Sequence, residues 1–262
     1  MCKRSIINAG NLDVSQGHNL TLLAGTVVSN GQLNAPGGQI VVAAVPGENL
    51  VRLSQPGNLL SLEIKPLTSN DSQPANWTLP VIALPQLLTG ADNTTKETLN
   101  NAGINLENGD VVVKELTAEK ATLSANRNLF LHQSQLSTTG DLNLLANDTV
   151  QVRDSAVQPF LAQSGKLYLQ GNQGVDIFAL SHPESGFFAN GDMILRSANT
   201  IGGDAYFRVG GDFRIEKLDS SPLLLALIAP VLLIREILPP FPLTNGLSPT
   251  KEIMLSFRVT SF

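Results

Sequence analysis

A short phrase recurs along the chain, in which a turn residue precedes an alternation of aliphatic residues with small or polar ones. Alternation with a period of two predicts a strand that buries one of its faces. The Gly, Asn and Asp residues between phrases predict that each strand ends after a few residues. The phrase occurs at residues 11–14, 19–22, 128–131, 141–144, 166–169, 192–195 and 212–215. Such repetition predicts that copies of one unit stack on one another, rather than closing around a single globular core.

The spacing of the phrases predicts how the units stack. The same interval separates Leu20 from Ile40, Ile40 from Leu60, and Met193 from Phe213. This interval matches one turn of a parallel β-helix, which takes about 20 residues as short strands separated by bends. We therefore expect an all-β solenoid of this kind. The fixed Leu-x-x-Leu-x-Leu frame of a leucine-rich repeat is absent, and a β-sandwich remains the structural alternative.

The presence or absence of the recurring phrase divides the chain into four regions. Residues 1–66 form a first β-helix block, and residues 109–217 form a second one. Between them, residues 67–108 carry several prolines and a polar, Asn-rich run, which predicts an irregular excursion with a short helix near Pro85–Leu88. Within the second block, Lys114–Ala121 has helical propensity, but the strands that flank it favour a strand there.

The composition changes in the fourth region, residues 218–262, which is apolar and rich in proline. Leu223–Ile234 is an apolar run that is too short for a membrane span, which needs about 20 residues, so we do not expect it to contact a membrane. The region is interpreted as a helix or extended segment docked on the open end of the stack, or as a disordered tail. A membrane-seeking segment and a shifted reading frame near Leu218 are the other hypotheses.

The charge and the cysteine content of the chain exclude several classes of function and of site. The net charge is −5, with 15% charged residues and no basic block, so nucleic-acid binding is not expected. Cys2 is the only cysteine, which excludes an internal disulfide and a cysteine-based metal site. Residues 1–8 do not resemble a signal peptide. Asn-x-Ser/Thr triplets, interpreted as a result of composition, begin at Asn19, Asn70, Asn76, Asn93 and Asn147.

The histidines and the glycine-aspartate pairs are the first candidates for chemistry. His18, His132 and His182 fall in different repeats without metal-ligand spacing, and we expect them at solvated turn or surface positions. Gly202-Gly203-Asp204 and Gly210-Gly211-Asp212 lack the tandem nonapeptide frame of calcium-binding repeats. We interpret both as plain turns and expect neither a metal nor a cofactor.

Carboxylates are the second candidates, because polysaccharide-cleaving β-helix enzymes cluster Asp with Arg or Lys on one face of adjacent turns. Asp192 and Asp212 are separated by the interval of one predicted turn, as stacked positions would be. Both open a strand phrase, where Asp is favoured for backbone capping. Asp141, Asp148 and Asp154 lie within one predicted turn, and we expect them to face different ways. We therefore assign no catalytic residue, and a carbohydrate-active lyase or hydrolase is the alternative function.

Three stretches carry a family resemblance. They are GNLDVSQGHNLTLLAGTVVSNGQLNAPGGQIVVAAVPGENLVRLSQPG, TLSANRNLFLHQSQLSTTGDLNLLANDTVQVRDSAVQPFLAQSGKLYLQGNQGVDI and NGDMILRSANTIGGDAYFRVGGDFRIEKL. This part of the chain, roughly residues 5–217, resembles filamentous-haemagglutinin-type exoproteins of two-partner secretion systems, particularly large cyanobacterial members.

The resemblance implies a right-handed parallel β-helix that is secreted through an outer-membrane transporter and displayed or released as an adhesin. The family's signal peptide and Asn-Pro-Asn-Gly-type motif are absent, so the transporter is expected only for an upstream secretion domain. We therefore expect an internal or truncated fragment of a longer protein that contacts a surface glycan or a protein receptor. Its function would be structural and non-enzymatic, with residues 67–108 as a specialised surface.

Overall fold

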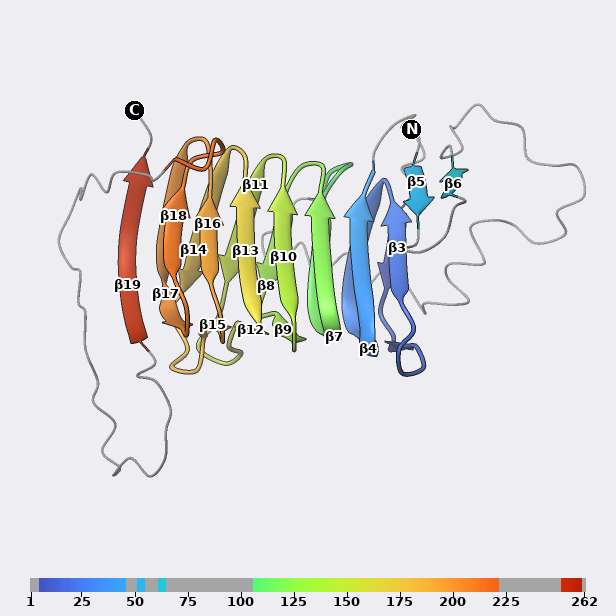
Figure 1. Cartoon of the computed structure of the whole chain (residues 1–262), viewed down its shortest axis with the longest axis horizontal. Helices are drawn as coiled ribbons and strands as arrows, with labels where there is room; N and C mark the ends of the chain where they lie inside the picture. Colours follow the sequence, from blue (N-terminus) through green and yellow to red (C-terminus); the bar gives the residue numbers. More distant parts are fainter. Residues whose placement is uncertain (1–4, 46–50, 55–60, 65–105, 222–250, 261–262) are drawn as a thin grey trace, which may run out of the picture.

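A computed structural model of the chain describes residues 5–45, 51–54, 61–64, 106–221 and 251–260 (Figure 1). Every regular element in these ranges is a β-strand. The first strands are β1 (Ser5–Asn8), β2 (Leu12–Asp13), β3 (Leu20–Ala24), β4 (Thr26–Ala44), β5 (Val51–Ser54) and β6 (Ser61–Ile64). They are followed by β7 (Val111–Ala125), β8 (Leu129–His132), β9 (Gln135–Thr138), β10 (Asp141–Ala146), β11 (Thr149–Arg153) and β12 (Leu161–Ser164). The last are β13 (Lys166–Gly171), β14 (Gly174–Ala179), β15 (Gly186–Ala189), β16 (Met193–Arg196), β17 (Thr200–Val209), β18 (Phe213–Glu216) and β19 (Lys251–Thr260).

The local predictions of strands are confirmed. Each copy of the recurring phrase coincides with a strand, namely β2, β3, β8, β10, β13, β16 or β18. In β10, Leu142 and Leu144 are fully buried while Asp141 is exposed, as the alternation predicts. Lys114–Ala121 lies inside β7, so the neighbouring strands override its helical propensity.

The strands of the large sheet pair in three rows. The first row is β3–β4–β7–β10–β13–β16–β18, which runs along the long axis in Figure 1. The second is β1–β4–β7–β8–β11–β14–β17. The third is β2–β4–β7–β9–β12–β15–β17. All pairs within these rows are parallel, so each row can extend from strand to strand with the same register.

The prediction of a right-handed parallel β-helix with about 20 residues per turn was wrong. The pairings close into a parallel barrel of eight strands, with the other strands of the sheet outside it. The ring runs β7–β8–β11–β14–β17–β15–β12–β9 and returns to β7. It closes because β7 pairs with both β8 and β9, and β17 with both β14 and β15.

The assumption of short strands caused this error. The strands were expected to be short and separated by bends, but β4, β7 and β17 run for 19, 15 and 10 residues and join two or three rows each. The predicted partners Leu20 with Ile40 and Met193 with Phe213 are confirmed. Leu142 and Leu167, which the sequence pattern also aligns at a wider interval, are register partners as well.

Aligned aliphatic side chains form the core. The inward residues of the first row are register partners in succession: Leu22, Val42, Leu123, Leu144, Leu169, Leu195 and Ile215. The third row contributes Leu33, Leu116, Leu136, Ala162, Phe187 and Phe207 in the same way. Each fully buried large apolar side chain stabilises the fold by roughly 1.5–3 kcal/mol. A continuous core therefore links all three rows.

Glycine allows β4 to bend while it stays paired. The register of β4 against β7 shifts between Ser29 and Gln32 and again between Ala35 and Gln39. A Cβ atom on Gly31 would lie 1.9 Å from the backbone oxygen of Gly10, so only glycine fits there. Glycine at the bends thus replaces the turn that was expected to end the strand.

Side-chain amides connect neighbouring strands of the first row at their ends. Asn147 donates to Asn126 at 3.3 Å, and Asn172 donates to Asn147 at 3.4 Å. Asn19 accepts the backbone N–H of Gln39 at 2.8 Å. Two of the five Asn-x-Ser/Thr positions therefore have structural contacts, while the other three lie outside the described residues.

An antiparallel strand covers one end of the second and third rows. β19 pairs with β17 along its whole length, from Thr200 opposite Thr260 to Val209 opposite Lys251. One of the alternatives for residues 218–262, an extended segment docked on the end of the stack, describes this strand. The predicted helix at Pro85–Leu88 and the apolar run Leu223–Ile234 lie outside the described residues, as does Leu60, the expected partner of Ile40.

The aromatic part of the core gives a test of this packing. Phe187 is fully buried, with its ring 4.9 Å from that of Phe160 and 5.3 Å from that of Phe207. We expect Phe187→Ala to lower the free energy of unfolding by about 3–5 kcal/mol, measured by urea denaturation. The matched control is Phe178→Ala, because the Phe178 side chain is 56% exposed and should cost under about 0.5 kcal/mol. Equal losses in the two variants would contradict the packing.

Candidate functional site

The outward side chains of β10, β13, β16 and β18 form the surface that we call the front face. Parallel pairing aligns them in rows across the strands, because alternate residues of each strand point outward. The middle row is Asn143, Tyr168, Ile194 and Arg214. The upper row is Leu145, Gln170, Arg196 and Glu216. The lower row has Asp141 opposite Lys166, followed by Asp192 at the start of β16.

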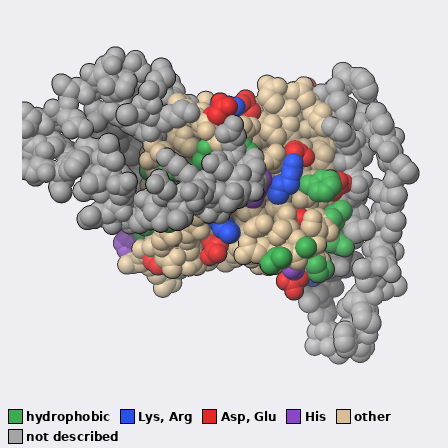
Figure 2. Space-filling model, turned by 180° about the vertical axis from the view of Figure 1, so that it is seen from behind, with side chains coloured by type: hydrophobic (Ala, Val, Ile, Leu, Met, Phe, Trp, Pro, Cys, Tyr) green, Lys and Arg blue, Asp and Glu red, His purple; other side chains and the backbone are tan. Residues whose placement is uncertain are grey.

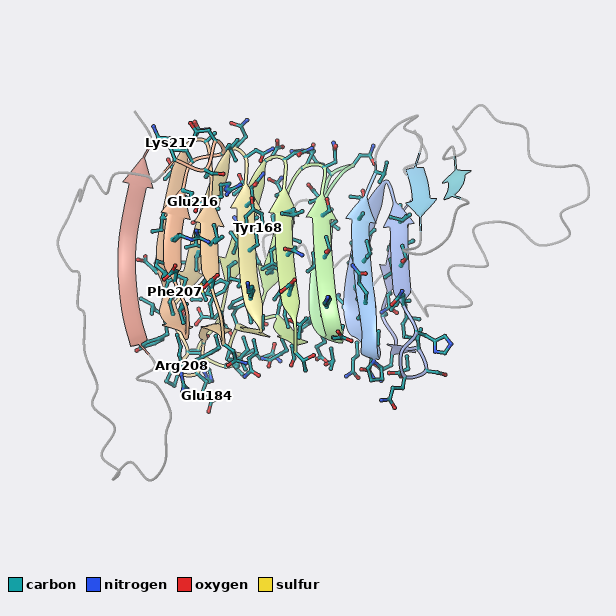
Figure 3. All side chains as sticks on the ribbon, viewed as in Figure 1. Tyr168, Glu184, Phe207, Arg208, Glu216 and Lys217 are labelled. Carbon is teal, nitrogen blue, oxygen red and sulfur yellow. The ribbon has the colours of Figure 1, made fainter. Side chains whose placement is uncertain are left out.

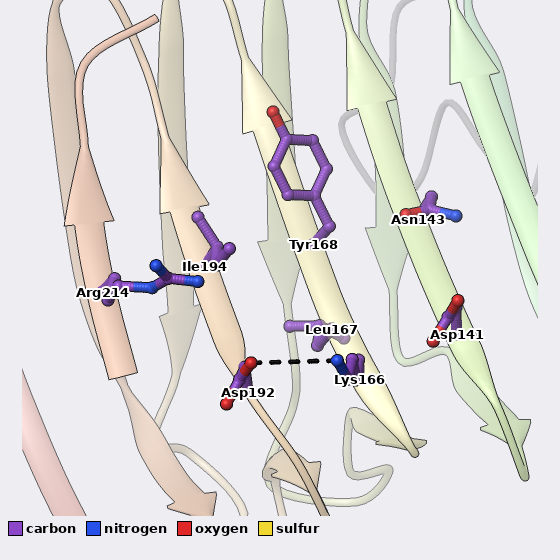
Figure 4. A pocket seen from close by; sticks show the side chains of 8 residues that line it. All are labelled: Asp141, Asn143, Lys166, Leu167, Tyr168, Asp192, Ile194 and Arg214. Carbon is purple, nitrogen blue, oxygen red and sulfur yellow. Dashed lines mark ion pairs between the residues drawn. The ribbon is translucent and has the colours of Figure 1, made fainter. Parts of the chain in front are cut away.

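A hollow of about 290 Å³ lies between the lower and middle rows. Figure 4 shows its side chains rising from four neighbouring strands. The lining residues are Asp141, Asn143, Lys166, Leu167, Tyr168, Asp192, Ile194 and Arg214. The hollow therefore combines two carboxylates, two cations, an amide and an aromatic ring on one face.

The carboxylate of Asp192 is engaged at both oxygens. Its Oδ1 accepts the backbone N–H of Asp212 at 3.0 Å, and its Oδ2 lies 3.9 Å from the Lys166 ammonium (Figure 4). Asp192 therefore caps a backbone N–H, but that of the neighbouring strand and not of its own turn. Because the Lys166 side chain is 66% exposed, this ion pair contributes at most about 1 kcal/mol.

Tyr168 and Glu216 both lie on the front face (Figure 3), and a chain of contacts holds Tyr168 in place. The Arg196 guanidinium lies over its ring, 5.2 Å from the centroid. Arg196 in turn donates to Glu216 at 2.5 Å, and the Tyr168 hydroxyl donates to Gln170. Burial raises the pKa of the Tyr168 phenol, and the nearby Arg196 partly opposes the rise. The ring is therefore a neutral, fixed platform at the edge of the hollow.

The three histidines occupy different environments. His18 lies in an exposed turn, and His182 lies in the loop between β14 and β15, so both agree with the expected turn or surface positions. His132 was expected at a solvated turn or surface position, but it is a half-buried residue of the strand β8. Among the described residues no three His, Cys, Asp or Glu side chains gather as a metal site would require.

A polar cluster surrounds His132 on the second row of strands. Its Nε2 atom is 2.9 Å from Oε1 of Gln151, while Arg153 pairs with Asp176 on the next strand. Burial lowers the pKa of His132, and the charge of Arg153 lowers it further. Because the neutral imidazole is favoured, protonation of His132 should work against folding.

Two glycine-aspartate predictions have opposite outcomes. Gly210-Gly211-Asp212 forms the bend between β17 and β18, as expected. Gly202-Gly203-Asp204 lies inside β17, so its interpretation as a turn was wrong. The first segment therefore connects two strands, and the second is part of one strand.

Asp148 and Asp154 do not line the hollow that contains Asp141. Asp148 lies 3.5 Å from the Arg127 Nε atom. Asp154 accepts the Ser185 hydroxyl at 2.7 Å and the His182 backbone N–H at 2.8 Å, which ties two loops together. The expectation that these three carboxylates face different ways is consistent with these contacts.

Sequence reasoning missed the aromatic and basic residues of the front face. The step along the chain from Asn143 to its partner Tyr168 is longer than the step from Ile194 to Arg214. The sequence pattern aligns the flanking leucines at both steps, and Leu167 and Leu169 enclose Tyr168. The alternation identifies Tyr168 only as an outward residue, however, and does not indicate which side chains meet it across the strands.

Comparison with models of protein families, with curated proteins and with solved structures gave no match. Within the described ranges, no helix has the length and apolar character needed to cross a membrane. The resemblance to haemagglutinin-type exoproteins stays a prediction.

The Arg196–Glu216 pair gives a prediction about stability. The two side chains are only 18% and 10% exposed, so Glu216→Ala leaves a largely buried cation without its partner. We expect a loss of about 1–3 kcal/mol in the free energy of unfolding. Lys166→Ala is the control, since it removes an exposed pair and should cost under about 1 kcal/mol. An equal cost for both would show that burial does not strengthen the Glu216 contact.

His132 gives a prediction about pH. Its pKa in the folded chain lies below the ordinary value of 6.5, so the unfolded state binds more protons as the pH falls below about 6.5. Stability should be complete above that pH and decline towards the folded pKa, by at most about 1.4 kcal/mol per pH unit. Urea titrations at pH 7.5 and pH 5.5 should show a smaller decline in His132→Gln than in the exposed control His18→Gln. The same decline in both variants would contradict this assignment.

Proposed function

We propose that the chain is a non-enzymatic structural segment of a secreted or surface-displayed, haemagglutinin-like adhesin. The observation that supports this most strongly is the in-register core. The same inward position is occupied by an aliphatic residue in strand after strand along the first row. Such a core holds an elongated body together while the outward positions are left for contact.

The outward positions also support a contact function. Phe178 on β14 is 56% exposed, while Leu180, directly after β14, and Tyr206 on β17 are each 39% exposed. Figure 2 shows apolar side chains on this side of the molecule, next to charged ones. Exposed apolar groups with polar neighbours are characteristic of surfaces that bind partners.

The sequence resemblance supports secretion and display, and it gives the partner as a surface glycan or a protein receptor.

A carbohydrate-active enzyme is the second candidate, and the hollow on the front face favours it. Asp141, Lys166 and Asp192 line it together with Arg214. This is the arrangement of acid and base side chains that cleavage of an acidic polysaccharide would require. Both oxygens of Asp192 are already engaged, however, which argues against its action as a general base.

Fractionation of cells that express the parent gene tests the proposal. Peptides of this chain should appear in the surface or medium fraction by mass spectrometry, together with peptides from the flanking reading frame. Purified chain incubated with polygalacturonate should produce neither unsaturated products nor new reducing ends. Peptides found only in the cytosol would overturn the adhesin proposal. Turnover that is lost in Asp192→Asn would replace it with the enzyme.

A further inference from the structure

We propose that the hollow on the front face binds a linear, neutral oligosaccharide that crosses the strands of the first row. The inference rests on the proposed contact function and gives that contact a chemical class. It is carried by three properties of the hollow: its direction, its balanced charge and its fixed aromatic ring.

The direction of the hollow suits a linear chain. Its lining comes from β10, β13, β16 and β18, which are successive neighbours in the first row. Three strand spacings of about 4.8 Å make a path of roughly 14 Å across the strands. Side chains from each strand meet this path at regular intervals (Figure 4). A ligand made of repeating units therefore meets one set of contacts on each strand.

The charges of the hollow balance. Asp141 and Asp192 contribute two negative charges, while Lys166 and Arg214 contribute two positive ones. Lys166 already faces Asp192, and the Arg214 Nε atom is 3.7 Å from Glu216. No excess charge attracts an anion or a cation. These side chains offer both hydrogen-bond donors and acceptors, which match hydroxyl groups that do both.

Tyr168 supplies an apolar surface beside these polar groups. Arg196 lies over the ring at 5.2 Å from its centroid, and Glu216 holds Arg196. A ring that is already fixed loses little conformational entropy when a ligand packs on it. Ile194, the register partner of Tyr168, extends the apolar strip. The C–H groups of a sugar ring can pack on Ile194 and on the part of the Tyr168 ring that Arg196 leaves uncovered, while its hydroxyl groups face the charged row.

The chain contains two tyrosines, and the second provides a matched control. Tyr206 is 39% exposed on β17, outside the hollow. The full chain is titrated with cellohexaose, maltohexaose, xylohexaose and mannohexaose, and with hexagalacturonate as the acidic comparison. Isothermal calorimetry measures the affinity at millimolar ligand. Urea denaturation of each variant shows whether the fold is retained.

We expect at least one neutral hexasaccharide to bind more tightly than hexagalacturonate. Tyr168→Ala should weaken that binding about tenfold or more, whereas Tyr206→Ala should leave it unchanged. Lys166→Ala, at an exposed position, should weaken it about threefold or more, which keeps the test valid if Tyr168→Ala fails to fold.

Three results would overturn the inference. They are binding of no neutral hexasaccharide, preferential binding of hexagalacturonate, and equal effects of the two tyrosine variants. Each of these results could be obtained with a chain that is present on the cell surface. Failure of this inference is therefore distinguishable from failure of the adhesin proposal.

Discussion

The structure depends on keeping parallel strands in register. Each interior strand satisfies its backbone N–H and C=O groups with the strands on both sides, and at the same time aligns its inward side chains with theirs. A slip of one residue would turn every inward aliphatic residue to solvent. Leu144 illustrates the constraint, since its register partners are Leu123 on one side and Leu169 on the other. Backbone pairing and apolar packing therefore select the same alignment.

The same register arranges the outer surface. A residue that flanks an inward leucine must point outward, and its partners on the next strands lie beside it. This is how Tyr168 comes to lie between Asn143 and Ile194, although the three are far apart in sequence. The rows of the front face are therefore a consequence of the core alignment. Substitutions in these rows can change the contacts of the surface while they leave the core intact.

The strands could be predicted from the sequence because each depends on local alternation. The closed ring could not be predicted, because it depends on how β7 and β17 continue past a bend and pair with two neighbours. Gly31 shows the difficulty: the sequence presents a turn residue, whereas the structure uses the missing Cβ for a close backbone approach within a strand. The hollow was missed because alternation marks its residues only as outward-facing and does not show that their side chains gather around one hollow.

Amide hydrogen exchange followed by NMR tests the shared register most directly. The amides of Leu144, Leu169 and Leu195 should exchange slowly and together, with a free energy close to that of global unfolding. Amides of β3 should exchange faster, because among the described strands it is bonded to β4 alone. Independent exchange of β10, β13 and β16, or exchange as fast as in an unfolded peptide, would contradict a body held together by one continuous alignment.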